Sequence, residues 1–303
     1  MSARRNGTSL EPIAAVAGLR ELAPHYAAIV CDVWGVLIDG VKCFPEAAEA
    51  LEKFRAAGKP VILVTNASRP DAEVRRQLAG IGVPAQCCDD LVSAGELTLG
   101  AIVARAGQAC HHLGPPRDRG LFAAAREKLA APLRMSDLAE ADYVVCTGLV
   151  DDEQEQPEDY DAVLGAMRAR DLPMLCANPD VVVAVGDRLY WCAGALAARY
   201  ERLGGKVEHF GKPHAPIYAA ARTRLDLLHG ARLEPTEILA IGDGVWTDVS
   251  GAQRAGLDCL FLTGGVHVEA LHPGGGDLDA AALSELLLGA KVQPKALARR
   301  LVW

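Results

Sequence analysis

The chain has 303 residues, half of them hydrophobic and 23% charged, an ordinary globular composition with enough apolar material for one large domain or two smaller ones. The net charge of −8 argues against nucleic acid or an anionic membrane as the main partner, and no apolar run approaches the length of a membrane span. Nine cysteines, an odd number scattered along the chain, do not form the pattern of a disulfide framework, so we expect a reduced, cytoplasmic protein.

The first third of the chain alternates strand-like and helix-like patterns. An apolar run ends on Asp32, which is how a buried strand brings a carboxylate to the rim of a sheet. Residues 45–58 carry apolar side chains at helical spacing, and residues 61–64 form a short apolar strand. Residues 71–82 are typical of an amphipathic helix that ends at a glycine. This βαβα order predicts a parallel sheet covered by helices.

A different block, with helices and strands of its own, follows from about residue 94 to residue 205. The earlier alternation then resumes between residues 216 and 266. The pattern predicts one α/β domain, formed by residues 1–93 and 206–303, that is interrupted by an inserted α/β domain at residues 94–205.

Two stretches that follow strands are suited to an anion. TNAS, at 65–68, precedes a helix, so a hydroxyl, an amide and unpaired backbone N–H groups come together there. The same residue types are also common N-caps, which is the plainer interpretation. GKP, at 211–213, holds Lys212 between glycine and proline ahead of another helix, although a lone lysine is usually solvated.

A third stretch, IGDGVWTD at 241–248, places Asp243 and Asp248 just after a strand, among glycines that let the backbone approach a ligand. Two carboxylates in such a place suit a hard cation such as Mg²⁺, and a turn with Asp248 as an N-cap is the alternative. Parallel sheets bind ligands at the carboxyl ends of their strands, so we expect Asp32 and these stretches to share one edge.

In this order the stretches resemble the motifs of the haloacid dehalogenase-like (HAD) superfamily of phosphohydrolases. ANPD, at 177–180, and GKP resemble the class IIA (NagD-type) subgroup, which includes sugar-phosphate, nucleotide and pyridoxal-phosphate phosphatases. The resemblance covers about residues 20 to 290. It implies a Rossmann-like core with a parallel sheet, interrupted by a C2-type α/β cap domain, and Mg²⁺-dependent hydrolysis of a small phosphorylated metabolite.

The resemblance also implies a role for the residues around the phosphoryl group. Asp32 would be the nucleophile that forms an aspartyl-phosphate, and Lys212 would neutralise charge on Asp32 and on the phosphate. Thr65 would hydrogen-bond the transferring group, with Asn66 and Ala67 beside it. Phosphoryl transfer needs mainly in-line positioning and cations around the phosphoryl oxygens, and this set would supply both.

Mg²⁺ is the cofactor that the resemblance implies. Asp32 and Asp243 would bind it directly, and the backbone carbonyl of Trp34 would be a further ligand. Asp248 would support the metal shell or orient Lys212. A carboxylate can attack a phosphoryl group only when a metal and a lysine offset the repulsion between the two anions.

The inserted domain would close over the site as a cap. In proteins of this type Asn178 and Asp180 would lie near the hinge and face the substrate. Caps of this kind often pair, so a homodimer is a further expectation. The expected partner is a small phosphorylated substrate, with neither nucleic acid nor a membrane involved.

Trp34 departs from the family pattern, in which a second aspartate protonates the leaving oxygen and then activates water. An indole does neither, and loss of a general acid-base costs about 10²–10⁴ in rate. Three interpretations stay open: the leaving group is acidic enough to need no proton, Asp39 supplies the proton, or the protein is a catalytically degenerate binder of a phosphorylated ligand. The indole itself could pack at the strand end or stack on a flat substrate.

Overall fold

The computed structural model describes residues 12–185 and 188–303, so the first eleven residues of the expected core range lie outside the described part. Its larger sheet has seven strands in the order β1-β14-β13-β12-β2-β3-β4, and every neighbouring pair is parallel. The strands are β1 (Ala14–Ala15), β2 (Ala28–Asp32), β3 (Val61–Thr65), β4 (Asp90–Ser93), β12 (Ile238–Gly242), β13 (Asp258–Leu262) and β14 (Ala296–Ala298). The expected α/β fold with a parallel sheet is confirmed.

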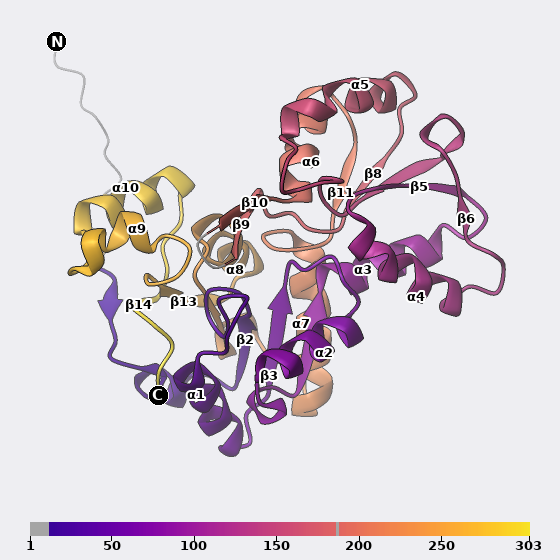
Figure 1. Ribbon diagram of the computed structural model, residues 1–303. Coiled ribbons are helices and arrows are strands. Elements are labelled where there is room, and N and C mark those ends of the chain that lie inside the picture. Colours follow the sequence, from indigo (N-terminus) through magenta and orange to yellow (C-terminus); the bar gives the residue numbers. More distant parts are fainter. Residues whose placement is uncertain (1–11, 186–187) are drawn as a thin grey trace, which may run out of the picture.

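Helices cover both faces of this sheet (Figure 1). They are α1 (Pro45–Ala56), α2 (Asp71–Ile81), α7 (Ala215–His229), α8 (Ser250–Ala255), α9 (Val268–Leu271) and α10 (Ala280–Ala290). Successive side chains of a strand point to opposite faces. Accordingly Ile29 packs into the core shared with α1 and α2, whereas Val30 packs into the core shared with α7 and α8. Because both faces of β2 are buried, its sequence is continuously apolar up to Asp32.

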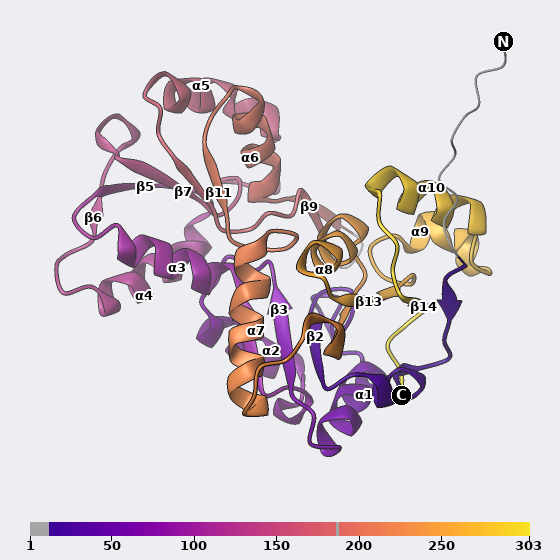
Figure 2. The same ribbon diagram turned by 180° about the vertical axis from the view of Figure 1, so that it is seen from behind.

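A second, parallel sheet stands above the first in the order β11-β8-β7-β5-β6 (Figure 2). Its strands are β5 (Ala109–Leu113), β6 (Arg134–Met135), β7 (Tyr143–Cys146), β8 (Met174–Cys176) and β11 (Val207–His209). The helices that accompany it are α3 (Ala94–Ala104), α4 (Gly120–Lys128), α5 (Asp161–Ala169) and α6 (Ala193–Arg202). We refer to this part of the molecule as the cap.

Two features of the cap differ from the expectation. The inserted domain was expected to end at residue 205, but β11 pairs with β8, so the strands of the cap sheet extend to His209. The sequence also gave no sign of an antiparallel hairpin, which β9 (Val182–Val185) and β10 (Arg188–Trp191) form directly after the ANPD segment.

Among the described residues, no helix combines the length and the apolar character that crossing a bilayer requires.

The order of the core strands brings the site together. β2 lies between β3 and β12, and all three run in the same direction. Asp32 is level with Val64, and Cys31 is level with Ile241. The residues that follow these three strands therefore meet at one edge of the sheet, below the cap.

Candidate active site

Asp32 ends the central strand and is only 7% exposed. Its Oδ1 accepts a hydrogen bond from the backbone N–H of Val33 at 2.7 Å, and the same oxygen forms an ion pair with Nζ of Lys212. Burial raises the pKa of Asp32 well above its usual value, and the charge of Asp248 adds to this, while Lys212 opposes it. Oδ1 is thus fixed by two donors, and the carboxylate is held in one orientation.

Lys212 reaches this carboxylate from the loop between β11 and α7. Its Nζ lies 2.8 Å from Oδ1 of Asp248 as well as against Asp32. Burial by itself would lower the pKa of Lys212, but the carboxylates of Asp248 and Asp32 raise it well above its usual value. The lysine is therefore a fixed cation between two buried acids.

The side chain of Asn66 holds the lysine loop in place. Its Oδ1 accepts from the backbone N–H of Lys212 at 2.6 Å, and its Nδ2 donates to the backbone carbonyl of Lys212 at 3.1 Å. A Cβ atom at residue 211 would come within 2.3 Å of Oδ1 of Asn66, so only Gly211 allows this approach. The side-chain amide of Asn66 is therefore engaged with the backbone of Lys212, and a role of this residue beside the phosphoryl group stays a prediction.

Asp243 and Asp248 follow β12, and a short π-helix (Val245–Val249) carries the second of them back toward the first. Oδ2 of Asp248 accepts from the backbone N–H of Gly244 at 3.0 Å. Oδ2 of Asp243 accepts from the backbone N–H of Val266 at 2.7 Å. Backbone donors therefore orient both carboxylates.

Two glycines make room for Asp243. A Cβ atom at Gly35 or at Gly265 would stand 1.9 Å or 2.0 Å from Oδ2 of Asp243. Gly35 also has a φ of +75°, a conformation that side chains with a Cβ rarely adopt. The first of these glycines lies in the turn after Asp32 and the second after β13, so three strand ends enclose one carboxylate.

Carboxylate oxygens of Asp32, Asp243 and Asp248 all lie within 4.8 Å of one another. Lys212 is the one cation that forms an ion pair with them among the described residues, so the cluster carries surplus negative charge. Burial, together with Asp248, raises the pKa of Asp243 to about 7. A group of hard oxygen donors with too little positive charge fits a divalent cation such as Mg²⁺.

Thr65 ends β3 beside Asp32, where we expected it. Its Oγ1 accepts from the backbone N–H of Ala67 at 3.2 Å, a hydrogen bond that shapes the TNAS turn. Thr65 is 1% exposed and Asn66 is 5% exposed, so the turn is buried. The N-cap of α2 is Pro70, so none of the TNAS residues caps the helix that follows.

Trp34 lies two residues after Asp32 and is only partly buried. Its indole packs against the core on the α1 side, and it also lies against the α carbon of Gly40. The side chain thus braces the loop at 38–43, which folds back through bridges between Trp34, Ile38 and Cys43. This packing is the interpretation that the sequence analysis left open beside stacking on a substrate.

The carboxylate of Asp39 is bound within its own loop and does not face the acidic cluster, as a proton donor to the leaving group would. Its Oδ1 accepts from the backbone N–H groups of Val41 and Lys42, each at 2.9 Å. Slight burial would raise the pKa of Asp39, but these hydrogen bonds outweigh it and lower the pKa. Within the described residues, Asp39 makes no hydrogen bond or ion pair with the acidic cluster. It is a poor candidate for the missing acid.

Of the two cap residues that we expected at the site, Asp180 reaches the core. Its Oδ1 accepts from Nδ2 of Asn66 at 2.9 Å, so a cap carboxylate, a core amide and the lysine loop form one chain of contacts. Burial raises the pKa of Asp180, and Lys212 opposes the shift. Oδ1 of Asn178 accepts from the backbone N–H of Asp180 at 3.0 Å, which fixes the turn that presents the aspartate.

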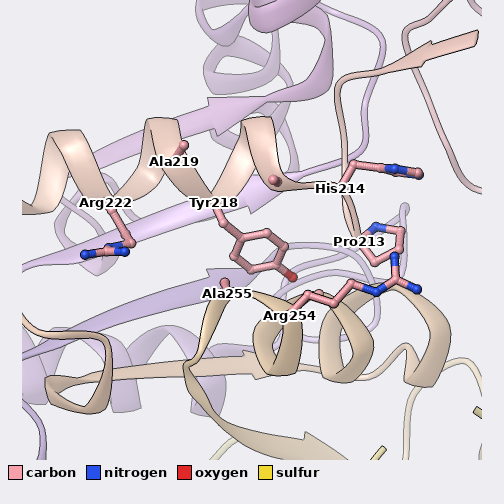
Figure 3. Close-up of a pocket in the computed structure, with 9 residues that line it drawn as sticks. Pro213, His214, Tyr218, Ala219, Arg222, Arg254 and Ala255 are labelled. Atoms are coloured by element: carbon pink, nitrogen blue, oxygen red, sulfur yellow. The ribbon is translucent and has the colours of Figure 1, made fainter. Parts of the chain in front are cut away.

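Tyr218 is a site neighbour that the sequence analysis missed, because it reads only as an apolar position of α7. It points from α7 toward α8 (Figure 3), and its hydroxyl lies 3.4 Å from the backbone carbonyls of Thr247 and Asp248. A cavity of about 400 Å³ opens beside it between the two helices. None of the three clustered aspartates lines this cavity, so the cavity lies beside the acidic cluster and is not the candidate active site.

Comparison with known proteins shows that this chain matches two related family models. The model of the family described as haloacid dehalogenase-like hydrolase matches residues 29–126, and that of the HAD-hydrolase-like family matches residues 209–285. Together these ranges include Asp32, Lys212 and Asp243. A crystal structure of a hydrolase of the haloacid dehalogenase-like family from Brucella suis 1330 is 42% identical, with a TM-score of 0.82, over 95% of this chain and all of that one.

Two more distant relatives match most of the chain. Chronophin of Homo sapiens is 26% identical over 266 residues, which cover 82% of this chain and 85% of the relative. The ribonucleotide monophosphatase NagD of Escherichia coli strain K12 is 26% identical over 243 residues, which cover 78% of this chain and 88% of NagD. The structure of NagD from the same strain shares the fold, with a TM-score of 0.61 and 20% identity over 91% of this chain and 96% of that one.

Proposed function

The chain belongs to the haloacid dehalogenase-like hydrolases, and on that premise we propose that it is a Mg²⁺-dependent phosphatase of a small phosphorylated metabolite. The observation that carries the proposal is the meeting of Asp32, Lys212, Asp243 and Asp248 at one edge of the sheet. A protein that only binds a ligand has no need of a buried nucleophile beside a fixed lysine.

In the proposed reaction a carboxylate oxygen of Asp32 attacks phosphorus. The new P–O bond forms as the ester P–O bond breaks, which leaves an aspartyl-phosphate and releases the leaving group as its oxyanion, which then takes a proton from water. Water then cleaves this acyl phosphate, yielding inorganic phosphate and restoring Asp32. Lys212 offsets charge on the nucleophile and on the phosphoryl oxygens in both steps.

Asp32, Asp243 and Asp248 would hold the metal, with the backbone carbonyl of Trp34 as a further ligand. When bound, Mg²⁺ supplies positive charge to the phosphoryl oxygens. The three carboxylates exceed the one lysine in charge, and this surplus supports the assignment of a divalent cation.

The leaving group is where this chain differs from its family pattern. Trp34 carries no proton to donate, and the lowered pKa of Asp39 keeps that carboxyl ionised. We therefore expect esters with an acidic leaving group, such as aryl, enol or acyl phosphates, to be hydrolysed faster than alkyl esters. Nucleotides, which the name of NagD suggests, and sugar phosphates fall in the slower group.

Two further expectations belong to this proposal. The nine cysteines are all free thiols, which suits a reducing compartment such as the cytoplasm. The homodimer expected from the cap also stays a prediction, to be checked by light scattering of the purified protein.

The test is phosphate release with and without Mg²⁺ from one aryl phosphate and a panel of alkyl phosphates. Wild type, Asp32→Asn and the matched loop variant Asp39→Asn are assayed in parallel. We expect metal-dependent aryl turnover that Asp32→Asn abolishes and Asp39→Asn retains. Equal, background release by wild type and Asp32→Asn on every compound would overturn the proposal and favour the alternative, a catalytically degenerate protein that binds a phosphorylated ligand.

A further inference from the structure

We infer that Asp118 of the cap is a positioning residue that holds the phosphate-binding turn of the core, residues 65–69, against the cap. The inference rests on the proposed function, because the turn matters for catalysis only if a phosphoryl group is bound there. It assigns a task to a residue that neither the motifs nor the family resemblance singled out.

The contact between cap and turn is direct and buried. Oγ of Ser68 donates to Oδ2 of Asp118 at 3.0 Å. Ser68 is 8% exposed and Asp118 is 6% exposed, so little water competes for either group. Nε of Arg69 lies 4.0 Å from Oδ1 of the same carboxylate. Two successive residues of the turn therefore face one cap side chain.

Asp118 is itself anchored within the cap. Burial raises the pKa of Asp118 overall, although the hydroxyl of Thr147, which is 4% exposed, lowers it, and Nε2 of His112 lies 2.9 Å from this hydroxyl. Burial lowers the pKa of His112 to about 4, with the charge of Arg119 acting in the same direction, so the ring is neutral near pH 7.

The other side of the turn is held by Gly95 and Ser93, where the chain leaves the core. The N–H of Gly95 donates to the carbonyl of Ala67 at 2.9 Å, and Oγ of Ser93 donates to the carbonyl of Arg69 at 2.7 Å. A Cβ atom at residue 95 would come within 2.3 Å of the carbonyl oxygen of Arg69. The turn is thus clamped between the start of α3 and Asp118.

This clamp acts on the residues that would hold the phosphoryl group. Ser68 lies three residues after Thr65, and Asn66 of the same turn holds the backbone of Lys212. Small displacements of groups that orient a reacting centre reduce rates strongly, because the reaction depends on their geometry. Loss of the Asp118 contact should therefore weaken phosphate binding without touching any reacting atom.

The experiment is a double-mutant cycle of Ser68→Ala and Asp118→Ala, with Asp118→Asn as the conservative variant. The dissociation constant of inorganic phosphate is measured by calorimetry in the presence of Mg²⁺, beside KM and kcat for an aryl phosphate. We expect each alanine variant to bind phosphate roughly tenfold more weakly and to raise KM by a similar factor, with a smaller change in kcat. The double variant should bind phosphate no more weakly than whichever single alanine variant binds it less tightly. Asp118→Asn should recover most of the phosphate affinity, because its amide oxygen still accepts the hydrogen bond from Ser68.

Matched controls are Asp161→Asn, on the outer face of the cap where its partner is Arg199, and Ser284→Ala on α10. Neither should change phosphate affinity. If phosphate affinity and KM stay at the wild-type values while only the melting temperature falls, or if the two effects simply add, the inference is wrong. Absence of turnover in wild type would instead count against the proposed function, and the calorimetric cycle would still decide the role of Asp118.

Discussion

The indole of Trp34 lies on the α carbon of Gly40: a Cβ atom at residue 40 would stand 2.4 Å from Cζ3 of the ring. Gly40 also has a φ of +88°, a value that favours glycine. Trp34, which stands where the family resemblance implies a second aspartate, therefore braces the loop after β2. The two roles, proton donor and brace, exclude each other at this position, because an aspartate is too short to cover the loop.

Gly40→Ala should destabilise the fold. The added methyl group meets the indole, and a residue with a Cβ in the left-handed region costs about 1–2 kcal/mol by itself. Urea denaturation should show at least this loss in the free energy of unfolding. In a double variant with Trp34→Ala, the added methyl group no longer meets the indole. The double variant should therefore lose less free energy of unfolding than the two single variants together, and strictly additive losses would contradict the contact.

Trp34→Asp should restore the missing acid. We expect turnover of alkyl phosphates to rise by about 10²-fold or more, whereas aryl phosphates, which need no proton, should change little. Trp34→Asn loses the same packing but supplies no proton, so it is the matched control. Steady-state rates on both substrate classes check this, and identical rates for the Asp and Asn variants on alkyl esters would rule out a missing acid as the limit.

Lys212→Met should cost both activity and stability. Removal of a fixed cation from the phosphoryl site should lower kcat/KM by about 10²–10³-fold. The uncompensated carboxylates of Asp32 and Asp248 should lower the free energy of unfolding of the metal-free protein by about 3–5 kcal/mol.

Lys128→Met is the control for this loss, since that lysine is 53% exposed in its ion pair with Glu96 and should contribute at most about 1 kcal/mol. Chemical denaturation in EDTA measures both variants. Equal stability of the two would mean that the buried ion pairs of Lys212 do not compensate the acidic cluster.

Mg²⁺ affinity should rise with pH. The pKa of Asp243 is raised to about 7, so below pH 7 this carboxyl is mostly protonated in the metal-free protein, and the metal must displace the proton. The Mg²⁺ concentration for half-maximal activity should therefore fall by up to about tenfold between pH 6 and pH 8.

The raised pKa of Asp243 also makes the stability of the metal-free protein depend on pH. Between about pH 4 and pH 7 the carboxyl of Asp243 is ionised in the unfolded chain but still protonated in the folded one, so the metal-free protein should lose stability as the pH rises through this range. The melting temperature in EDTA, measured across this pH range, reports the loss. In Asp243→Asn the melting temperature should depend less on pH, because this residue no longer titrates. A Mg²⁺ requirement that does not change between pH 6 and pH 8 would contradict the raised pKa.

Much of the fold was predictable because its signals are local. The apolar runs that end on Asp32 and Thr65, and the helix after Pro45, depend on residues a few positions apart. The rule that parallel strands bind ligands at their carboxyl ends then placed Asp32 and Asp243 at one edge without knowledge of any contact, whereas Lys212 reaches that edge from a loop after a strand of the cap sheet.

Other features were decided by tertiary structure alone. Asp39 looked like a candidate acid by its position, but its carboxylate turns back to two backbone N–H groups of its own loop. The sequence placed Asn66 beside Thr65 but did not show that its side-chain amide holds the backbone of Lys212, which lies 146 residues later. Which way a polar side chain points depends on donors and acceptors that chain folding brings close, and sequence spacing does not record them.

The range over which interactions act separates what the sequence determined from what the tertiary structure decided. The sequence by itself determined the alternation of elements, the parallel core and the residue types at each strand end, because periodicity and strand propensity act over short distances. The tertiary structure decided how the acids, the lysine and the cap are joined, as in the pair of Ser68 and Asp118, 50 residues apart. Such contacts form only between groups that are buried together, and burial is a property of the whole packed chain.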